Sequence, residues 1–114
     1  MIHKTLENLA EISRLLDKAV DDYATLDEEA VLTKSEYEVA YARTFLSMEG
    51  AIEIRKQQAL LDTWEQRLDN ERAESSVRIC RERIRKLHAQ LEVHRSINAA
   101  QRAQFMAEPL GQYT

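Results

Sequence analysis

The amino-acid sequence predicts an all-α protein, built as a long antiparallel helical hairpin with an N-terminal helix packed alongside. Three observations lead to this prediction. The 114 residues include only 2 Gly and 1 Pro, while charged residues make up 32%, a composition typical of long helices. Apolar residues recur in alternating steps of four and three, as they do in coiled coils. One glycine within the first hundred residues, Gly50, divides the chain into two arms.

The first arm begins with an amphipathic helix. Its apolar seam advances in steps of four and three, through Ile2, Leu6, Leu9, Ser13, Leu16, Val20 and Tyr23. The pattern then weakens, and two matches to a capping box follow, Thr25-x-x-Glu28 and Thr33-x-x-Glu36. We therefore expect a break in the helix between Asp22 and Ser35. The alternative is one continuous helix from Ile2 to Glu49.

The second arm carries the clearest seam of the chain. Its members follow one another in 4-3 steps, as Ala73, Val77, Cys80, Ile84, Leu87, Leu91, His94 and Asn98. Such a stripe needs a partner helix, and a slender chain of this length buries little surface by itself. We therefore expect a homo-oligomer, whose candidate seam consists of Val77, Cys80, Ile84, Leu87 and Leu91.

The boundaries of the second arm are predicted from glycine, proline and a change in the phase of its apolar seam. Gly50 lies where a glycine ends a helix, and a short connection makes the two arms antiparallel. Upstream of Ala73 another seam is formed by Ile54, Leu61, Trp64 and Leu68. The two seams differ in phase, which predicts a bend or a change of packing partner at residues 69–76. Pro109 is expected to end the helix, leaving one domain over residues 1–108 and a flexible tail over 109–114.

The charges of the chain are unevenly distributed and suggest two candidate surfaces. Residues 1–54 hold 12 acidic and 5 basic side chains, and residues 55–114 hold 8 acidic and 11 basic ones. Arg78, Arg81 and Arg85 share a helical face and form a candidate nucleic-acid contact, because such a stripe can follow phosphates. Alternatively, these arginines pair with the acidic first arm. A candidate surface for a basic protein partner is formed by Asp21, Asp22, Asp27, Glu28 and Glu29.

The sequence offers little for catalysis. It contains none of the common phosphate-binding, zinc-binding or nucleophile motifs, so we predict no catalytic residue, cofactor or metal site and expect a non-enzyme. Cys80 is the only cysteine, which excludes an internal disulfide. No apolar run approaches the length of a membrane span and no signal peptide is visible, so a cytoplasmic location is expected. The aromatic-rich face is predicted to be core, and the alternative is a stacking platform for bases; it consists of Tyr37, Ala40, Tyr41, Phe45, Leu46 and Met48.

Part of the chain resembles a known group of proteins. The residues that carry the resemblance are Tyr37-x-x-Ala40-Tyr41-Ala42-Arg43-x-x-Leu46-x-x-Glu49-Gly50, Arg55, Arg78-x-x-Arg81, Leu87-x-x-Gln90-Leu91 and Arg95-Ser96-x-Asn98. Together they resemble small helical proteins of bacteriophages and prophages, which are encoded near single-strand annealing recombinases and single-stranded-DNA-binding proteins. The resemblance implies a protein acting in the host cytoplasm as an accessory to DNA recombination or replication. It implies no catalytic residue.

Three functional hypotheses follow. The first is a helical phage protein that assists recombination or replication by binding a protein partner. The second is direct binding of nucleic acid through Arg78, Arg81 and Arg85. The third is an inhibitor of a host defence nuclease, comparable to anti-CRISPR proteins, that presents the acidic cluster to a basic channel.

Overall fold

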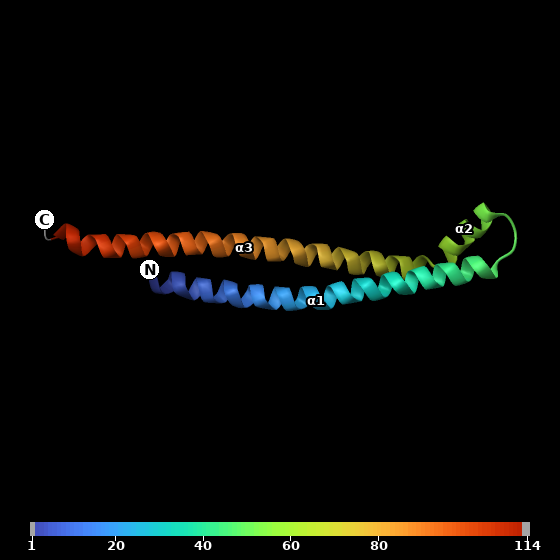
Figure 1. The fold of residues 1–114 in the computed structure, drawn as a ribbon, viewed down its shortest axis with the longest axis horizontal. Helices are drawn as coiled ribbons and strands as arrows, with labels where there is room; N and C mark the ends of the chain where they lie inside the picture. The colour runs from blue at the N-terminus through green and yellow to red at the C-terminus, as the bar shows by residue number, and fades with distance from the viewer. Residues whose placement is uncertain (1, 113–114) are drawn as a thin grey trace. The chain divides into compact units, whose positions relative to one another are not determined.

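The chain folds into an all-α helical hairpin (Figure 1). In the computed structural model the backbone of residues 2–112 and the side chains of residues 4–107 are described. Within this range there are three helices and no strand: α1 (Ile2–Ser47), α2 (Ile52–Asp62) and α3 (Trp64–Gln112). The predicted all-α helical hairpin is therefore confirmed. The N-terminal segment is part of α1 and does not form a separate helix packed alongside.

Helix α1 is continuous, so the predicted break between Asp22 and Ser35 is wrong and the alternative of one long helix is right. The Thr33 hydroxyl donates to the carbonyl oxygens of Glu29 at 2.9 Å and of Ala30 at 3.2 Å. It therefore bonds backward within the helix, in a pattern that interior threonines adopt, and does not cap a new N-terminus. Ala30 and Thr33 are also buried, so packing stabilises this polar segment.

The residues group into two compact units by their contacts. The terminal unit comprises Met1–Asp21 and Arg81–Thr114, and the turn unit comprises Asp22–Cys80. The predicted domain over residues 1–108 contains all of the turn unit and all of the terminal unit except residues 109–114.

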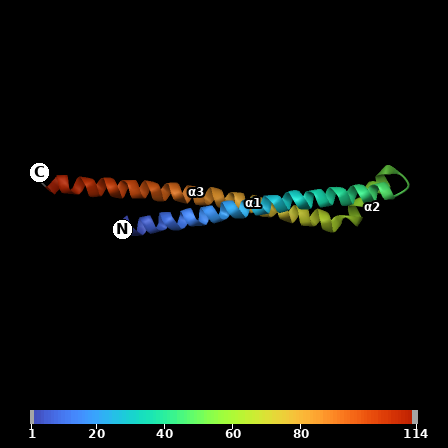
Figure 2. The same ribbon diagram turned by 60° about the horizontal axis from the view of Figure 1, so that its bottom comes forward.

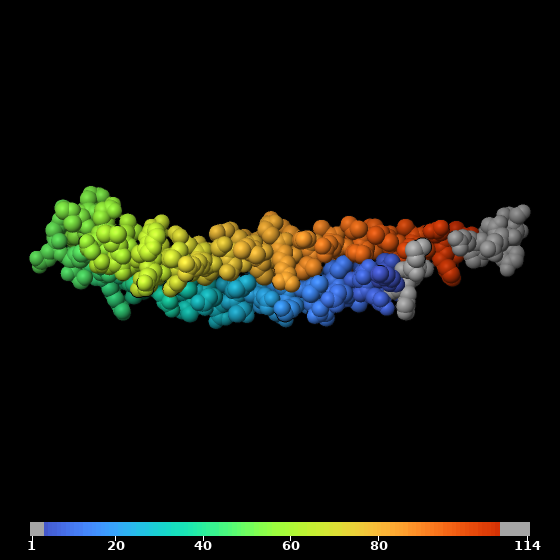
Figure 3. All heavy atoms as spheres, turned by 180° about the vertical axis from the view of Figure 1, so that it is seen from behind, coloured from blue at the N-terminus to red at the C-terminus, as the bar shows by residue number. Residues whose placement is uncertain are grey.

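The terminal unit is held together by a small apolar core. Ile12 and Ala19 of α1 are buried with Leu87 and Leu91 of α3. Four partly buried side chains pack against this cluster: Leu9, Leu15, Leu16 and Ile84. Near the end of this unit the Thr5 hydroxyl donates to the Gln101 side-chain oxygen at 2.9 Å. In Figure 3 the side chains of the two segments, blue and orange, lie against each other.

A buried polar contact connects the helices of the turn unit. The Asn70 side-chain amide donates to the Ala30 carbonyl oxygen at 3.1 Å and to the Thr33 hydroxyl oxygen at 3.2 Å. All three residues are buried. A buried asparagine on a coiled-coil seam favours the one register in which its amide finds acceptors. We infer that Asn70 sets the pairing of α1 with α3 in this unit.

Two local features shape the turn. Gly50 has a φ of 112°, a conformation that glycine adopts at little cost. The guanidinium of Arg55 then reaches back and donates to the Phe45 carbonyl oxygen at 3.1 Å. This carbonyl lies in the last turn of α1, where backbone acceptors lack helical partners and positive charge is favourable. The turn predicted at Gly50 is thus confirmed.

The second arm is interrupted at Thr63, between α2 and α3. Over residues 69–76, where a bend or a change of packing partner is predicted, α3 is one continuous helix. Thr63 has φ −113° and ψ 19°. Its hydroxyl donates to the Ala59 carbonyl oxygen at 2.6 Å, beside the backbone N–H bond to the same oxygen. Such competition bends helices. In Figures 1 and 2, α2 lies beside the C-terminal end of α1.

The predicted helix end at Pro109 is also wrong, because α3 extends to Gln112. Proline removes one backbone donor, and here the loss of that single bond does not stop the helix. Residues 113–114 of the predicted tail lie outside the described residues, and the flexibility of residues 109–112 stays a prediction.

The contact line of each helix differs in part from the predicted seam. Leu6, Ser13 and Val20 of the first seam are exposed. The buried residues of α1 whose side chains are described all belong instead to one unbroken 4-3 series, whose other members are half-buried: Thr5, Leu9, Ile12, Leu16, Ala19, Tyr23, Leu26, Ala30, Thr33, Tyr37, Ala40 and Thr44. In the second arm the seam from Ala73 onward is as predicted. It continues upstream in the same phase through Asn70, Gln66, Thr63 and Ala59, of which Gln66 alone is exposed.

Removing a core side chain of the terminal unit should destabilise the hairpin. We expect Leu87→Ala to cost about 2–3 kcal/mol, because it opens a cavity at a buried position. Val93→Ala, on the same helix but 57% exposed, should change the free energy of unfolding by less than about 0.5 kcal/mol. Chemical denaturation followed by circular dichroism measures both. Equal losses would contradict the assigned contact line.

The Asn70 contact makes a second prediction about stability. Asn70→Asp should cost about 3 kcal/mol or more at neutral pH, because a buried carboxylate would face the Ala30 carbonyl oxygen, and the Thr33 hydroxyl could donate to it only by giving up its bonds to the helix backbone. Asn70→Leu leaves no buried donor unsatisfied and should stay within about 1 kcal/mol of the wild type. Thermal melting compares the two variants. An Asp variant as stable as the Leu variant would show that position 70 is not buried.

Candidate interaction surfaces

The turn unit exposes an apolar surface beside the turn. We call it the tip surface and define it by Ile54, Leu61 and Trp64. These side chains are 55–70% exposed. Leu61 lies seven residues after Ile54, so both side chains project from the same face of α2. Ala59, which is fully buried, lies on the opposite face.

The tip surface was missed because its residues were assigned to a seam. Ile54, Leu61, Trp64 and Leu68 were predicted to pack inward, and of these only Leu68 is partly buried. The contact line is occupied by smaller and polar residues instead. The spacing that identifies the contact line is visible in the sequence. Alternating steps of three and four residues, counted backward from Ala73, pass through Asn70, Thr63 and Ala59. The prediction assigned the large apolar residues to the seam, although their spacing does not continue the seam that starts at Ala73.

Aromatic side chains support the end of α1 close to the turn. The Tyr41 and Phe45 rings stack with an interplanar angle of 9°, and Tyr37 meets Tyr41 edge to face. The Arg55 guanidinium lies 4.2 Å from the centre of the Phe45 ring, within the range of a cation–π contact. The aromatic residues of this face, with Ala40 and Met48, are half-buried. Leu46 is 76% exposed, so the prediction that the face is core is wrong at Leu46.

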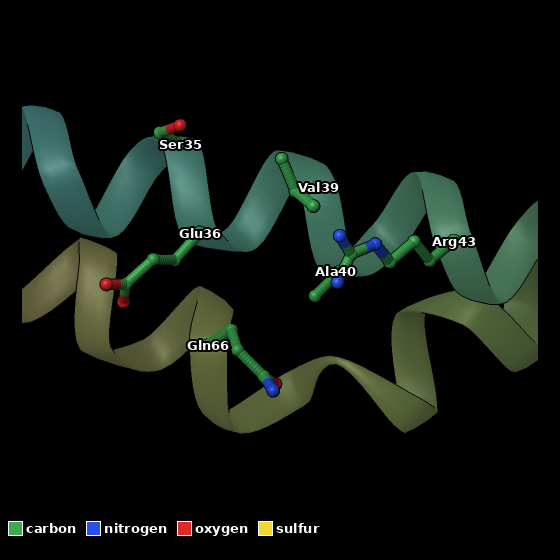
Figure 4. Close-up of a pocket in the computed structure, with 6 residues that line it drawn as sticks. All are labelled: Ser35, Glu36, Val39, Ala40, Arg43 and Gln66. Carbon is green, nitrogen blue, oxygen red and sulfur yellow. The ribbon is translucent and has the colours of Figure 1, made fainter.

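Two open cavities flank the seam of the turn unit. One, of about 290 Å³, is lined by Tyr37, Glu38, Tyr41 and Leu60. The other is a groove of about 410 Å³ between α1 and α3, lined by Ser35, Glu36, Val39, Ala40, Arg43 and Gln66. Figure 4 shows Glu36 and Arg43 toward opposite ends of this groove, with Val39 and Ala40 between them.

The three arginines of the candidate nucleic-acid contact are exposed on α3. Arg78 belongs to the turn unit, and Arg81 and Arg85 belong to the terminal unit. Arg85 pairs with Glu82 at 2.6 Å on its own helix. Arg78 makes no hydrogen bond or ion pair within the part of the chain whose side chains are described. Pairing of Arg85 with the acidic first arm, the alternative interpretation, is not what the structure shows.

Other charges on the outer faces are also paired along their own helices. Arg14 donates to both carboxylate oxygens of Glu11, and Arg95 pairs with Glu92. The hydrogen bond from Arg14 lowers the pKa of the Glu11 carboxyl, and the same bond raises the pKa of Arg14. Because these side chains are exposed, such pairs add little to stability.

The acidic cluster is divided between the units. Asp21 is exposed in the terminal unit; Asp27, Glu28 and Glu29 are exposed in the turn unit, where Asp22 is half-buried. The use of these carboxylates by a basic partner stays a prediction. Among the residues whose side chains are described, no group of three or more His, Cys, Asp and Glu side chains is arranged to hold a metal ion.

The candidate oligomer seam is covered by the chain itself. Val77 and Cys80 are buried in the turn unit, Leu87 and Leu91 are buried in the terminal unit, and Ile84 is half-buried there. These side chains are therefore not available to a second copy while the hairpin is closed. The structure contains one chain, so oligomerisation stays a prediction. An oligomer of closed hairpins would use other residues.

Comparison with protein-family models, curated proteins and solved structures found no match to this chain. None of the described helices has both the length and the apolar character needed to cross a bilayer. Function is therefore inferred from the fold and from the surfaces described above.

Proposed function

We propose that this chain is a non-enzymatic helical interaction protein that binds a protein partner through the tip surface. The observation that carries the proposal is the exposure of Ile54 and Leu61 on one face of α2 and of Trp64 directly after it. Clustered exposed apolar side chains are a feature of protein–protein contact sites, and tryptophan is enriched among the residues that dominate such contacts.

The anchoring of this surface supports the same proposal. Ala59 and Thr63 are buried on the inner side of this segment, and the contact of Arg55 with the Phe45 carbonyl ties α2 to the end of α1. A surface held in place before binding loses less conformational freedom on association. The tip surface thus combines apolar exposure with a supported backbone.

The biological setting rests on the resemblance described above. The resembling residues extend from Tyr37 into α3, and the group they resemble is encoded near recombination and single-stranded-DNA-binding genes. We propose accordingly that the chain is a phage accessory to DNA recombination or replication that acts in the host cytoplasm, with a protein of that process as its partner.

Capture of the partner tests the tip surface. Tagged wild-type chain is expected to retain a recombination or replication protein from cells that produce it, and Leu61→Asp should lose this protein because a carboxylate replaces an exposed apolar contact. Val93→Asp, also exposed but in the terminal unit, is the matched control. Mass spectrometry of the retained proteins makes the comparison. Equal capture by both variants would contradict the proposal.

A second candidate function is contact with nucleic acid, favoured by the exposure of Arg78 without a partner among the described side chains. If the chain has this function, it should bind single-stranded DNA with an affinity that falls steeply as the salt concentration rises. Arg78→Glu with Arg81→Glu should then lower the affinity about tenfold or more and reduce the salt dependence. Fluorescence anisotropy at two salt concentrations measures this. Affinity that is unaffected by the arginine changes would exclude this role.

A further inference from the structure

A second exposed stripe lies on α1 within the turn unit. Leu32, Val39 and Leu46 are 52%, 45% and 76% exposed. They are seven residues apart, which is close to two helical turns, so they form one line along the helix. None of the three belongs to the contact line with α3. We call them the α1 stripe.

Charged residues follow one side of this stripe and small residues follow the other. Glu36 and Arg43 each lie four residues after a member of the stripe, on the side of the groove (Figure 4). Ser35 and Ala42 each lie three residues after a member of the stripe, so they project around the helix in the opposite direction from Glu36 and Arg43. Both are exposed, and Ser35 also lines the groove. Neither Glu36 nor Arg43 makes a hydrogen bond or an ion pair within the part of the chain whose side chains are described. Small residues allow a second helix to approach closely.

The stripe is complementary to itself when one copy is reversed. Leu32 and Leu46 lie at equal distances from Val39, so in an antiparallel pair centred on Val39 each leucine meets the other leucine of the second copy. Glu36 lies three residues before Val39 and Arg43 four residues after it. The same register therefore brings Glu36 of each copy opposite Arg43 of the other. This reciprocal arrangement is what a two-fold interface requires.

We propose that the α1 stripe is the interface through which two copies of this chain pair, with their α1 helices antiparallel and centred on Val39. Charge complementarity selects a second copy as the occupant: each unpaired carboxylate and guanidinium of one chain finds its counter-charge on the other. The groove beside Val39 and Ala40 leaves space for these charged ends. This interface differs from the oligomer seam predicted around Val77 and Leu87, which is buried inside the hairpin.

The size of the interface indicates how strong the dimer is. The stripe from Leu32 to Leu46 extends over about 21 Å of helix. Three apolar side chains with their neighbours cover less than the roughly 800 Å² per partner found in stable complexes. A reversible dimer with a Kd on the order of micromolar is therefore expected, rather than a permanent one.

Charge reversal tests the pairing and its direction. Glu36→Arg alone and Arg43→Glu alone each bring like charges together, so each should raise the Kd for self-association at least about tenfold. An equal mixture of the two variants restores both opposite-charge pairs and should dimerise as tightly as the wild type. Sedimentation velocity across a concentration series measures each Kd. Lys34→Glu, an exposed charge about 140° around the helix from Val39, is the control and should leave the Kd unchanged.

Several outcomes would overturn the proposal. These are a wild-type chain that stays monomeric up to millimolar concentration, single variants with unchanged Kd, or a mixture that is no tighter than its components. Circular dichroism checks that the variants remain helical, as expected for exposed positions. Partner capture through the tip surface is independent of the stripe: Leu61→Asp should still dimerise, and Val39→Asp should lose dimerisation while keeping the partner.

Discussion

A helix in a two-helix hairpin has one line of contact with its neighbour, and that limit accounts for most of this structure. The 4-3 series of α1, and that of the second arm from Ala59 of α2 into α3, form these contact lines. A residue one position away from them is flanking or exposed, whatever its hydrophobicity. Ala30, Ala59 and Thr63 are buried for this reason, while Leu61 and Trp64 are exposed. The surfaces proposed here for partner binding and for self-association consist of apolar residues that the contact lines leave uncovered.

Polar groups specify how the contact lines meet. The Asn70 amide finds the Ala30 and Thr33 oxygens in one register only, which a seam of purely apolar side chains would specify less strictly. Gly50 and Arg55 fix the end of α1, and the hydroxyl of Thr63 separates α2 from α3. These few contacts hold the tip surface in place and leave Glu36 and Arg43 on the outside of α1.

The sequence was sufficient for the fold class, the turn at Gly50 and the downstream seam, because these depend on glycine geometry and on heptad spacing. The break between Asp22 and Ser35 was wrongly predicted, since local capping signals cannot reveal that Thr33 is buried against Asn70. The upstream seam was wrongly assigned because large apolar residues were followed instead of the spacing. The tip surface was missed for the same reason, and the α1 stripe could be recognised only once α1 was known to be continuous.

Trp64 allows the most direct test of this account, because it is the only tryptophan and lies on the seam in one interpretation and outside it in the other. The structure gives it 55% exposure, with Arg67 beside its ring. Acrylamide quenching of the folded chain, compared with the chain in denaturant, reports how accessible the indole is. We predict strong quenching and red-shifted emission in the folded state. Weak quenching with blue-shifted emission would place Trp64 inside the hairpin and contradict the assigned contact lines.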